Sequence, residues 1–199
     1  MSSRRLRYYI EGGSLQGSSY LYRGCKDTSP PLKVRSHILP YELYFGDQSK
    51  SWTGSVAFIA PEPSDARTLA RAYLITFEQF CSIVAEESYL TEPVKIRKTS
   101  ESHYQIEPEI SGMYDHLLYC GNLEGYPMLT FTAKVPQPAP IRPAVPYLEI
   151  IAEGLREAHG LEGTALLEYL HQHRGLKNTY TKVELADALG LPELLHASA

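Results

Sequence analysis

Cysteine is scarce in this sequence, and its spacing excludes two common frameworks of small proteins. The 199 residues hold three cysteines, Cys25, Cys81 and Cys120, and no Cys-x-x-Cys pair. An odd number of widely separated thiols favours neither a disulfide framework nor a cysteine-ligated zinc site. We therefore predict a reduced protein of the cytoplasm.

Long apolar runs and an excess of basic residues are also missing. No stretch approaches the roughly 18 apolar residues that suggest a membrane-spanning helix. After Arg4, Arg5 and Arg7, the sequence YYIEGGSLQG is too interrupted for the apolar part of a secretory signal. The formal net charge is −4, whereas nucleic-acid binding usually requires a basic face. We expect no membrane or nucleic-acid partner, and we interpret the three arginines as the solvated face of a first helix.

Several familiar catalytic and cofactor-binding signatures are absent as well. The glycine-rich segment 12–17 lacks a lysine and follows no clear strand, so it is neither a P-loop nor a dinucleotide fingerprint. No Gly-x-Ser-x-Gly nucleophile elbow is present. His171 and His173 are two residues apart and cannot share a helix face as ligands of one metal, even with His159 nearby. We expect no metal and no cofactor.

The length suits one domain with an appendage, and the order of the patterned segments indicates an α+β fold. The last two of three strands, separated by PEPSD, are expected to pair antiparallel. Residues 11–37 are expected to be irregular, and 89–112 give no assignable pattern. The expected elements are a helix at 2–10, strands at 39–46, 53–60 and 68–75, a helix at 76–88, a hairpin of 113–121 with 126–135, a proline-rich strap at 136–146, and helices at 146–160, 163–175 and 181–190.

The helix expected at 76–88 ends in two adjacent carboxylates. Thr76 and Gln79 match a capping box, as do Thr181 and Glu184 later in the chain. Consecutive helical residues point about 100° apart, so we expect only one of Glu86 and Glu87 to face a cleft while the other stays in water. A solvated helix end and a general base are both compatible with this pattern.

Two further segments carry chemistry of lower specificity. The single tryptophan, Trp52, precedes Thr53, Gly54 and Ser55, which form either a simple turn or a loop whose small residues let backbone N–H groups reach a ligand. Cys25 lies among basic neighbours that would lower the pKa of an exposed thiol. We favour an unreactive loop cysteine.

The segments LYFGDQSKSWTGSVAFI and ARAYLITFEQFCSIVAEES together resemble the gamma-glutamylcyclotransferase-like superfamily. Ser49 and Trp52 keep the family's Ser-x-x-Trp loop, and Gly54-Ser55 stands where Gly-Gly is usual. Counting along the helix places Glu87 at the catalytic position. The segment PAVPYLEIIAEG resembles the late Pro-x-x-Tyr segment, so the resemblance implies substrate contacts at Ser51, Trp52, Gly54, Ser55 and Tyr147.

The sequence also resembles a set of bacterial proteins through YIEGG, YRGCKD, the Trp52 loop, RAYLIT and LTFTA. Some proteins of this set carry the label histone deacetylase. A deacetylase of that kind would need a zinc site of histidine and aspartate ligands, and this sequence offers no such set.

The resemblance implies a small closed mixed β-barrel with surrounding helices over residues 1–135. The proline-rich strap and a helical region at 147–199 that packs on the barrel would follow. The implied chemistry is cyclisation of a γ-glutamyl amine or dipeptide to 5-oxoproline and free amine, with Glu87 as general acid and base and with no metal or cofactor. Whether the helical region also forms a homodimer contact stays open.

One departure from the family pattern leaves activity open. The superfamily begins with a strand that ends in Tyr-Gly-Ser-Asn, and this chain is expected to begin just after that motif. Gly13-Ser14 as a degenerate copy is less favoured, because the residues before it are expected to be helical. A non-catalytic small-molecule binding or interaction protein on the same fold is therefore the alternative hypothesis.

Overall fold

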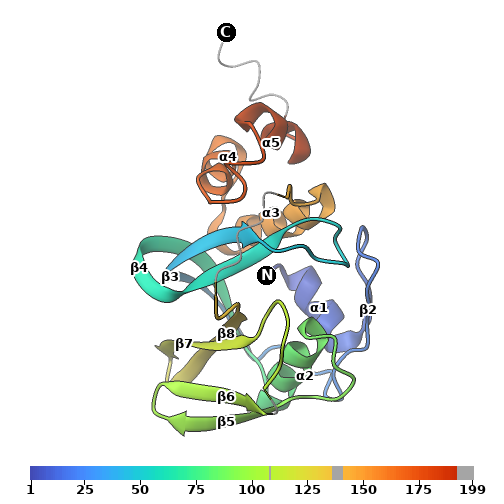
Figure 1. The fold of residues 1–199 in the computed structure, drawn as a ribbon, viewed down its shortest axis with the longest axis vertical. Coiled ribbons are helices and arrows are strands. Elements are labelled where there is room, and N and C mark those ends of the chain that lie inside the picture. Colours follow the sequence, from blue (N-terminus) through green and yellow to red (C-terminus); the bar gives the residue numbers. More distant parts are fainter. Residues whose placement is uncertain (108, 136–140, 192–199) are drawn as a thin grey trace.

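The computed structural model describes residues 1–107, 109–135 and 141–191. They form an α+β fold in which the helices lie on two sides of a long β-ribbon (Figure 1). The helices in this part of the chain are α1 (Ser3–Glu11), α2 (Phe77–Glu87), α3 (Val145–His159), α4 (Gly163–His171) and α5 (Lys182–Ala188). The strands are β1 (Gly13–Ser14), β2 (Leu21–Tyr22), β3 (Lys33–Gly46), β4 (Val56–Leu74), β5 (Lys95–Ser100), β6 (His103–Glu107), β7 (His116–Leu123) and β8 (Tyr126–Thr132).

The ribbon of β3 and β4 pairs antiparallel from Lys33 opposite Leu74 to Gly46 opposite Val56. The prediction of two paired strands at 53–60 and 68–75 was wrong, because both belong to β4. Residues 33–38, expected to be irregular, are instead the partner of 69–74. The PEPSD segment is accommodated as an irregularity of the register near Tyr41, which fits the tolerance of bulges for proline.

Two shorter hairpins follow helix α2 in the chain. Strands β5 and β6 occupy the stretch that the sequence left unassigned, with Tyr104 and Ile106 buried. The predicted hairpin after it is confirmed as β7 and β8. Its turn residues, Glu124 and Gly125, both have positive φ, as a tight two-residue hairpin turn requires.

The α+β class is confirmed, but the closed barrel expected from the resemblance is not found. Across the described residues, the strands pair as four separate two-stranded antiparallel sheets. Side chains rather than strand pairing connect the hairpins: the Thr132 hydroxyl donates to the Ile59 carbonyl, and the Tyr104 and Tyr119 rings stack. The prediction was wrong because hydrogen bonding along each strand is satisfied by its neighbour in sequence.

Local capping chemistry sets the starts of the helices. The Ser2 hydroxyl accepts from the Arg5 backbone N–H at the start of α1. At the start of α2, Thr76 and Gln79 form the predicted capping box, and Thr181 and Glu184 form the second at α5. These caps satisfy helical N–H groups that lack an intrahelical partner, so they are readable from a few adjacent residues.

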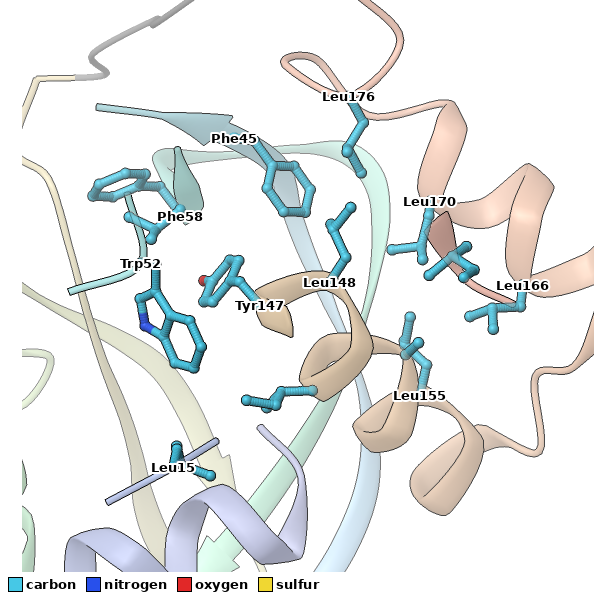
Figure 2. Close-up of a cluster of buried hydrophobic side chains, with 14 of the residues drawn as sticks. Leu15, Phe45, Trp52, Phe58, Tyr147, Leu148, Leu155, Leu166, Leu170 and Leu176 are labelled. Atoms are coloured by element: carbon cyan, nitrogen blue, oxygen red, sulfur yellow. The ribbon is translucent and has the colours of Figure 1, made fainter. Parts of the chain in front are cut away.

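Helix α3 packs between the ribbon and the last two helices (Figure 2). Tyr147 and Leu148 of α3 share one buried cluster with Phe45 and Trp52 on one side and with Leu170 of α4 on the other. Of the predicted strap at 136–146, residues 136–140 lie outside the described residues, and helix α3 already begins at Val145. Within the described part of the chain, no helix is both long enough and apolar enough to span a membrane.

Candidate functional site

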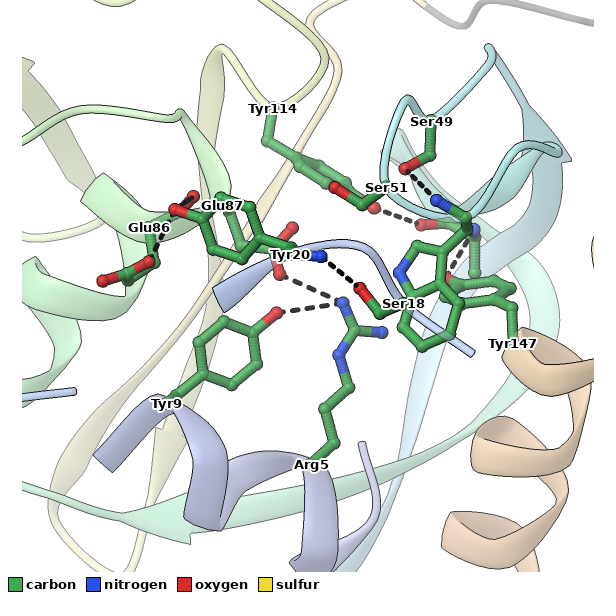
Figure 3. Close-up of polar contacts among 12 residues, drawn as sticks. Arg5, Tyr9, Ser18, Tyr20, Ser49, Ser51, Glu86, Glu87, Tyr114 and Tyr147 are labelled. Carbon is green, nitrogen blue, oxygen red and sulfur yellow. Dashed lines mark hydrogen bonds and ion pairs between the residues drawn. The ribbon is translucent and has the colours of Figure 1, made fainter. Parts of the chain in front are cut away.

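The two glutamates at the end of helix α2 lie at the centre of the site. The structure buries both: Glu86 is 4% exposed and the Glu87 side chain 13%. The expectation that one of them would stay in water was wrong. Two different segments cover the helix end, because residues 20–23 bond to Glu86 while helix α1 bonds to Glu87 (Figure 3).

Glu86 is an anchor for the segment that contains strand β2. The Tyr20 hydroxyl donates to Oε2 at 2.7 Å, and the backbone N–H and Nε of Arg23 donate to Oε1 at 3.1 and 2.9 Å. Burial, together with the hydrogen bond to Glu86, raises the pKa of Tyr20 to about 12, so the phenol remains a neutral donor. Glu86 is therefore occupied by protein donors on both oxygens.

Glu87 has a different partner, the guanidinium of Arg5. Nη2 of Arg5 donates to Glu87 Oε1 at 3.0 Å and to the Tyr9 hydroxyl at 2.9 Å. The interpretation of the arginines as a solvated face holds for Arg4 and Arg7, whose side chains are 42% and 62% exposed, and was wrong for Arg5, which is 14% exposed. Arg5 and Tyr9 are one helical turn apart, so both reach the end of α2 from the same face of α1.

Aromatic rings surround the Arg5 guanidinium. Its Cζ lies 5.6 Å from the ring centroid of Tyr9, 6.0 Å from that of Trp52 and 5.6 Å from that of Tyr147. A cation at these distances is attracted to the ring faces. The Nε atom is buried without a hydrogen-bond partner. Three rings and one carboxylate thus hold a positive charge inside the fold.

The ion pair and its burial act in opposite directions on the Glu87 carboxyl. Burial raises the pKa of Glu87 above its usual value, and the charge and hydrogen bond of Arg5 offset part of that rise. Burial would lower the pKa of Arg5, but the Glu87 carboxylate and nearby tyrosines outweigh it and raise the pKa. Glu87 therefore has the properties of a proton acceptor and donor next to a permanent positive charge.

The loop that contains Trp52 is closed by its own hydrogen bonds. The backbone N–H groups of Ser49 and Thr53 donate to Gly54 O and Ser49 O at 2.9 and 3.0 Å, and the Trp52 N–H donates to the Ser49 hydroxyl at 3.3 Å. The sequence raised the alternative that backbone N–H groups here reach a ligand. Three of these donors already have partners in the loop, so the side chains of Ser51 and Trp52 are what the loop presents.

The remaining predicted substrate contacts lie behind this loop. A Cβ at Gly54 would lie 2.6 Å from Arg142 O and 2.8 Å from Ala144 N, so the glycine permits close packing against the segment before α3. Ser55 is fully buried, and its hydroxyl has no hydrogen-bond partner. The Tyr147 hydroxyl accepts from the Ala57 N–H at 2.9 Å, and its ring lies against Trp52 and Arg5. These three residues support the site from behind.

A small cavity lies between the two glutamates and the Trp52 loop. Its volume of about 30 Å³ suits one or two water-sized groups, and it opens into a surface hollow of about 390 Å³ that includes space open to solvent. Of the predicted site residues, Glu87, Ser51 and Trp52 line it, while Gly54, Ser55 and Tyr147 do not. The lining consists of Arg5, Tyr20, Tyr22, Ser49, Ser51, Trp52, Val56, Glu86, Glu87, Tyr89, Met113 and Tyr114.

Tyr89 is held at the edge of the cavity by an unusual backbone conformation. It follows helix α2 with φ of +55°, in the left-handed region where glycine is the usual residue. The Leu90 N–H donates to Ala85 O at 2.9 Å, which closes the helix end around Tyr89. The Tyr89 ring meets Tyr20 edge-on, and its hydroxyl lies 3.0 Å from the Ser51 hydroxyl. A strained non-glycine residue that bridges two walls of a cavity suggests a functional position.

Sequence reasoning missed Arg5, Tyr89 and the tyrosines that line the cavity. A signal for Arg5 existed: Leu6, Tyr9 and Ile10 form a buried stripe on α1, and Arg5 borders it one turn before Tyr9. No comparable signal marks Tyr20, since the segment before β2 has no periodicity.

Metal and thiol chemistry find little support in this part of the protein. No group of three or more His, Cys, Asp and Glu residues that could hold a metal ion occurs among the described residues. Cys25 is buried, and burial raises the pKa of its thiol to about 11, which agrees with an unreactive cysteine.

Comparisons with known proteins give one distant relative. No family model matches the chain, and no solved structure matches it. A protein named Histone deacetylase 5 from Arabidopsis thaliana is similar, with 28% identity over 172 residues that cover 77% of this chain. The match covers 26% of that relative, so this chain spans about a quarter of its length.

Proposed function

We propose that this protein is a gamma-glutamylcyclotransferase-like enzyme that converts a γ-glutamyl amine or dipeptide to 5-oxoproline and a free amine. The observation that carries the proposal is Glu87. Its carboxyl lines a cavity, its pKa is raised by burial, and the Ser51–Trp52 loop forms another wall of the same cavity.

The reaction needs one group that accepts and then returns a proton. The α-amine of the γ-glutamyl group, in its neutral form, attacks the γ-carbonyl carbon and forms the ring C–N bond. Glu87 accepts the proton that the attacking nitrogen loses and gives it to the leaving nitrogen as the original C–N bond breaks. General acid–base catalysis of this kind contributes about 10²–10⁴-fold to a rate.

The cavity walls provide side-chain donors for the developing oxyanion. The hydroxyls of Ser51 and Tyr89 lie 3.0 Å apart. Burial raises the pKa of Tyr114 well above its usual value, so its phenol also stays protonated. Such fixed donors favour a negatively charged intermediate. We assign these side chains this part because the backbone N–H groups of Ser49, Trp52 and Thr53 are engaged within the loop.

The test is release of 5-oxoproline from a panel of γ-glutamyl amines and dipeptides, measured for the wild type, Glu87→Gln and Glu92→Gln. Glu92 is exposed and serves as the matched control. We expect product from at least one compound, a loss of at least about 100-fold in kcat for Glu87→Gln, and no change for Glu92→Gln. No product from any compound, or full activity of Glu87→Gln, would refute the proposal.

A second candidate is a non-catalytic protein that binds a small molecule in the same cavity. The Arg5–Glu87 ion pair favours it, since it occupies the proposed base when no ligand is bound. This alternative predicts that γ-glutamyl compounds raise the melting temperature without being consumed. It also predicts that Glu87→Gln leaves this stabilisation unchanged.

The name of the Arabidopsis relative leads to a weaker proposal. A zinc-dependent deacetylase needs a group of metal ligands, and the described residues contain no such group. The matched segment is also only 26% of that protein. We therefore do not propose deacetylation for this chain.

A further inference from the structure

The guanidinium of Arg5 inside the cavity is not required by the proton transfers proposed for Glu87. We propose that Arg5 is the carboxylate-binding residue of the pocket, and that its ion pair with Glu87 is a resting contact which an incoming carboxylate replaces. The inference rests on the proposed function for the choice of ligand.

The charges around the cavity favour an anion at Arg5. Arg5 is the one Arg or Lys among the described residues that line the cavity. Glu86 is already matched by Arg23, whose Nε lies 2.9 Å from it. The positive charge available to a ligand is therefore that of Arg5.

Arg5 has hydrogen-bonding capacity that Glu87 does not use. A guanidinium has five N–H donors, and its strongest contact with a carboxylate is a pair of parallel hydrogen bonds. Glu87 receives one bond, from Nη2, and the buried Nε has no partner. A carboxylate that bonds to Nε and a terminal nitrogen together would satisfy the orphaned donor.

The exchange would also place the reacting amine. In a γ-glutamyl compound, the α-carboxylate and the α-amine are attached to the same carbon. A carboxylate bound to Arg5 therefore holds the amine close to Glu87, which is a neighbour of the same guanidinium. Loss of the Arg5 contact removes the interaction that lowers the pKa of Glu87, so the freed carboxylate becomes a stronger base.

The test measures binding of an unreactive pair of ligands by calorimetry. The ligands are 5-oxo-L-proline, which carries the carboxylate, and 5-oxo-L-prolinamide, which is neutral and of the same shape. The proteins are the wild type, Glu87→Gln, Glu86→Gln, and the double variants Arg5→Gln/Glu87→Gln and Arg5→Lys/Glu87→Gln. The Arg5→Gln double variant avoids leaving Glu87 buried without its partner.

Competition between Glu87 and the ligand makes the expected pattern specific. The wild type should prefer the acid over the amide by at least about tenfold, in line with a charge-assisted bidentate contact. Glu87→Gln should tighten the acid several-fold without changing the amide, while Glu86→Gln should not tighten it. Arg5→Gln/Glu87→Gln should bind the two ligands equally. Arg5→Lys/Glu87→Gln should keep a reduced preference, because an ammonium cannot form the parallel bonds.

Three results would overturn the inference. The first is a wild type that does not prefer the acid, including one that binds neither ligand. The second is an acid preference that persists in Arg5→Gln/Glu87→Gln. The third, decisive if that variant does not fold, is an undiminished preference in the lysine double variant. An Arg5-dependent preference without turnover would refute only the proposed function, and turnover with an Arg5-independent preference would refute only this inference.

Discussion

Arg5 Nη2 lies 3.0 Å from Glu87 Oε1, which joins the first helix to the end of helix α2 across 82 residues of sequence. Both side chains are largely buried. Two buried charges of opposite sign depend on each other, because removal of one leaves the other without a partner in a weakly polar environment. The pair is therefore both a structural link and a constraint on any chemistry at Glu87.

We predict that Arg5→Met lowers the free energy of unfolding by about 3 kcal/mol, because it leaves the Glu87 charge unpaired. Adding Glu87→Leu to Arg5→Met should recover most of that loss. The control is Arg4→Met: Arg4 pairs with Glu153 at the surface, and an exposed pair contributes about 0–1 kcal/mol. Denaturant unfolding measures all three variants. Equal effects of Arg4→Met and Arg5→Met would contradict the burial argument.

The pH dependence of activity should report Glu87. A base must be ionised to accept a proton, and burial raises the pKa of Glu87 above 4.5. We therefore expect the acid limb of kcat/KM to lie above pH 4.5. Arg5→Gln should move it further up by about one unit, because the charge of Arg5 lowers this pKa. An acid limb that does not move in Arg5→Gln would show that another group titrates.

The same shift has a consequence for stability. The folded protein holds a proton on Glu87 at pH values where the unfolded chain has released it. The contribution of Glu87 to the free energy of unfolding is thus most favourable below pH 4.5 and is lost as the pH rises through its folded pKa. Glu87→Gln should remove this slope, which unfolding at a series of pH values would show.

Tyr89 offers a test that separates stability from binding. Tyr89→Gly relieves a left-handed conformation that costs a non-glycine residue about 1–2 kcal/mol, so stability should stay level or rise. Loss of the ring and of the hydroxyl near Ser51 should weaken ligand binding about tenfold. Tyr89→Phe is the matched control, since it keeps the strain and the ring. A glycine variant that binds as tightly as the wild type would remove Tyr89 from the site.

Features set by a few adjacent residues were predictable from the sequence. The capping boxes at Thr76 and Thr181 and the tight turn at Glu124 depend on local hydrogen bonds and dihedral angles. The long strand β4 was not predictable in the same way, because its PEPSD segment has turn residues and its partner, residues 33–38, shows no alternation. The hairpin of β5 and β6 was missed because most of its side chains are polar.

The candidate site shows the same division. Glu87, Ser51 and Trp52 were named through the resemblance, and the structure brings them to one cavity. Arg5 was assigned to solvent because three arginines in seven residues suggested a polar face. Its burial depends on how α1 packs against α2, a relation between distant segments that no local pattern contains.

Gly54 should tolerate no side chain. A Cβ there would lie 2.6 Å from Arg142 O and 2.8 Å from Ala144 N, and both are backbone atoms that cannot rotate away. We expect Gly54→Ala to lower the free energy of unfolding by about 1–3 kcal/mol, as overpacking of an interior does. Ser51→Ala in the same loop should change it by less than about 0.5 kcal/mol. If thermal unfolding shows no loss for Gly54→Ala, the close packing against the segment before α3 is not required.

Acid sensitivity should arise in part from His173, whose ring meets Tyr169 edge-on. Burial, with a smaller effect of Lys177, lowers the pKa of His173 from 6.5 to about 4. The unfolded chain therefore binds a proton that the folded protein excludes, and the contribution of His173 is present above pH 6.5 and lost as the pH falls towards 4. The loss should reach about 3 kcal/mol at pH 4. Unfolding of His173→Gln should be less steep over this range, whereas His171→Gln should follow the wild type; an unchanged slope in His173→Gln would assign the acid sensitivity to other groups.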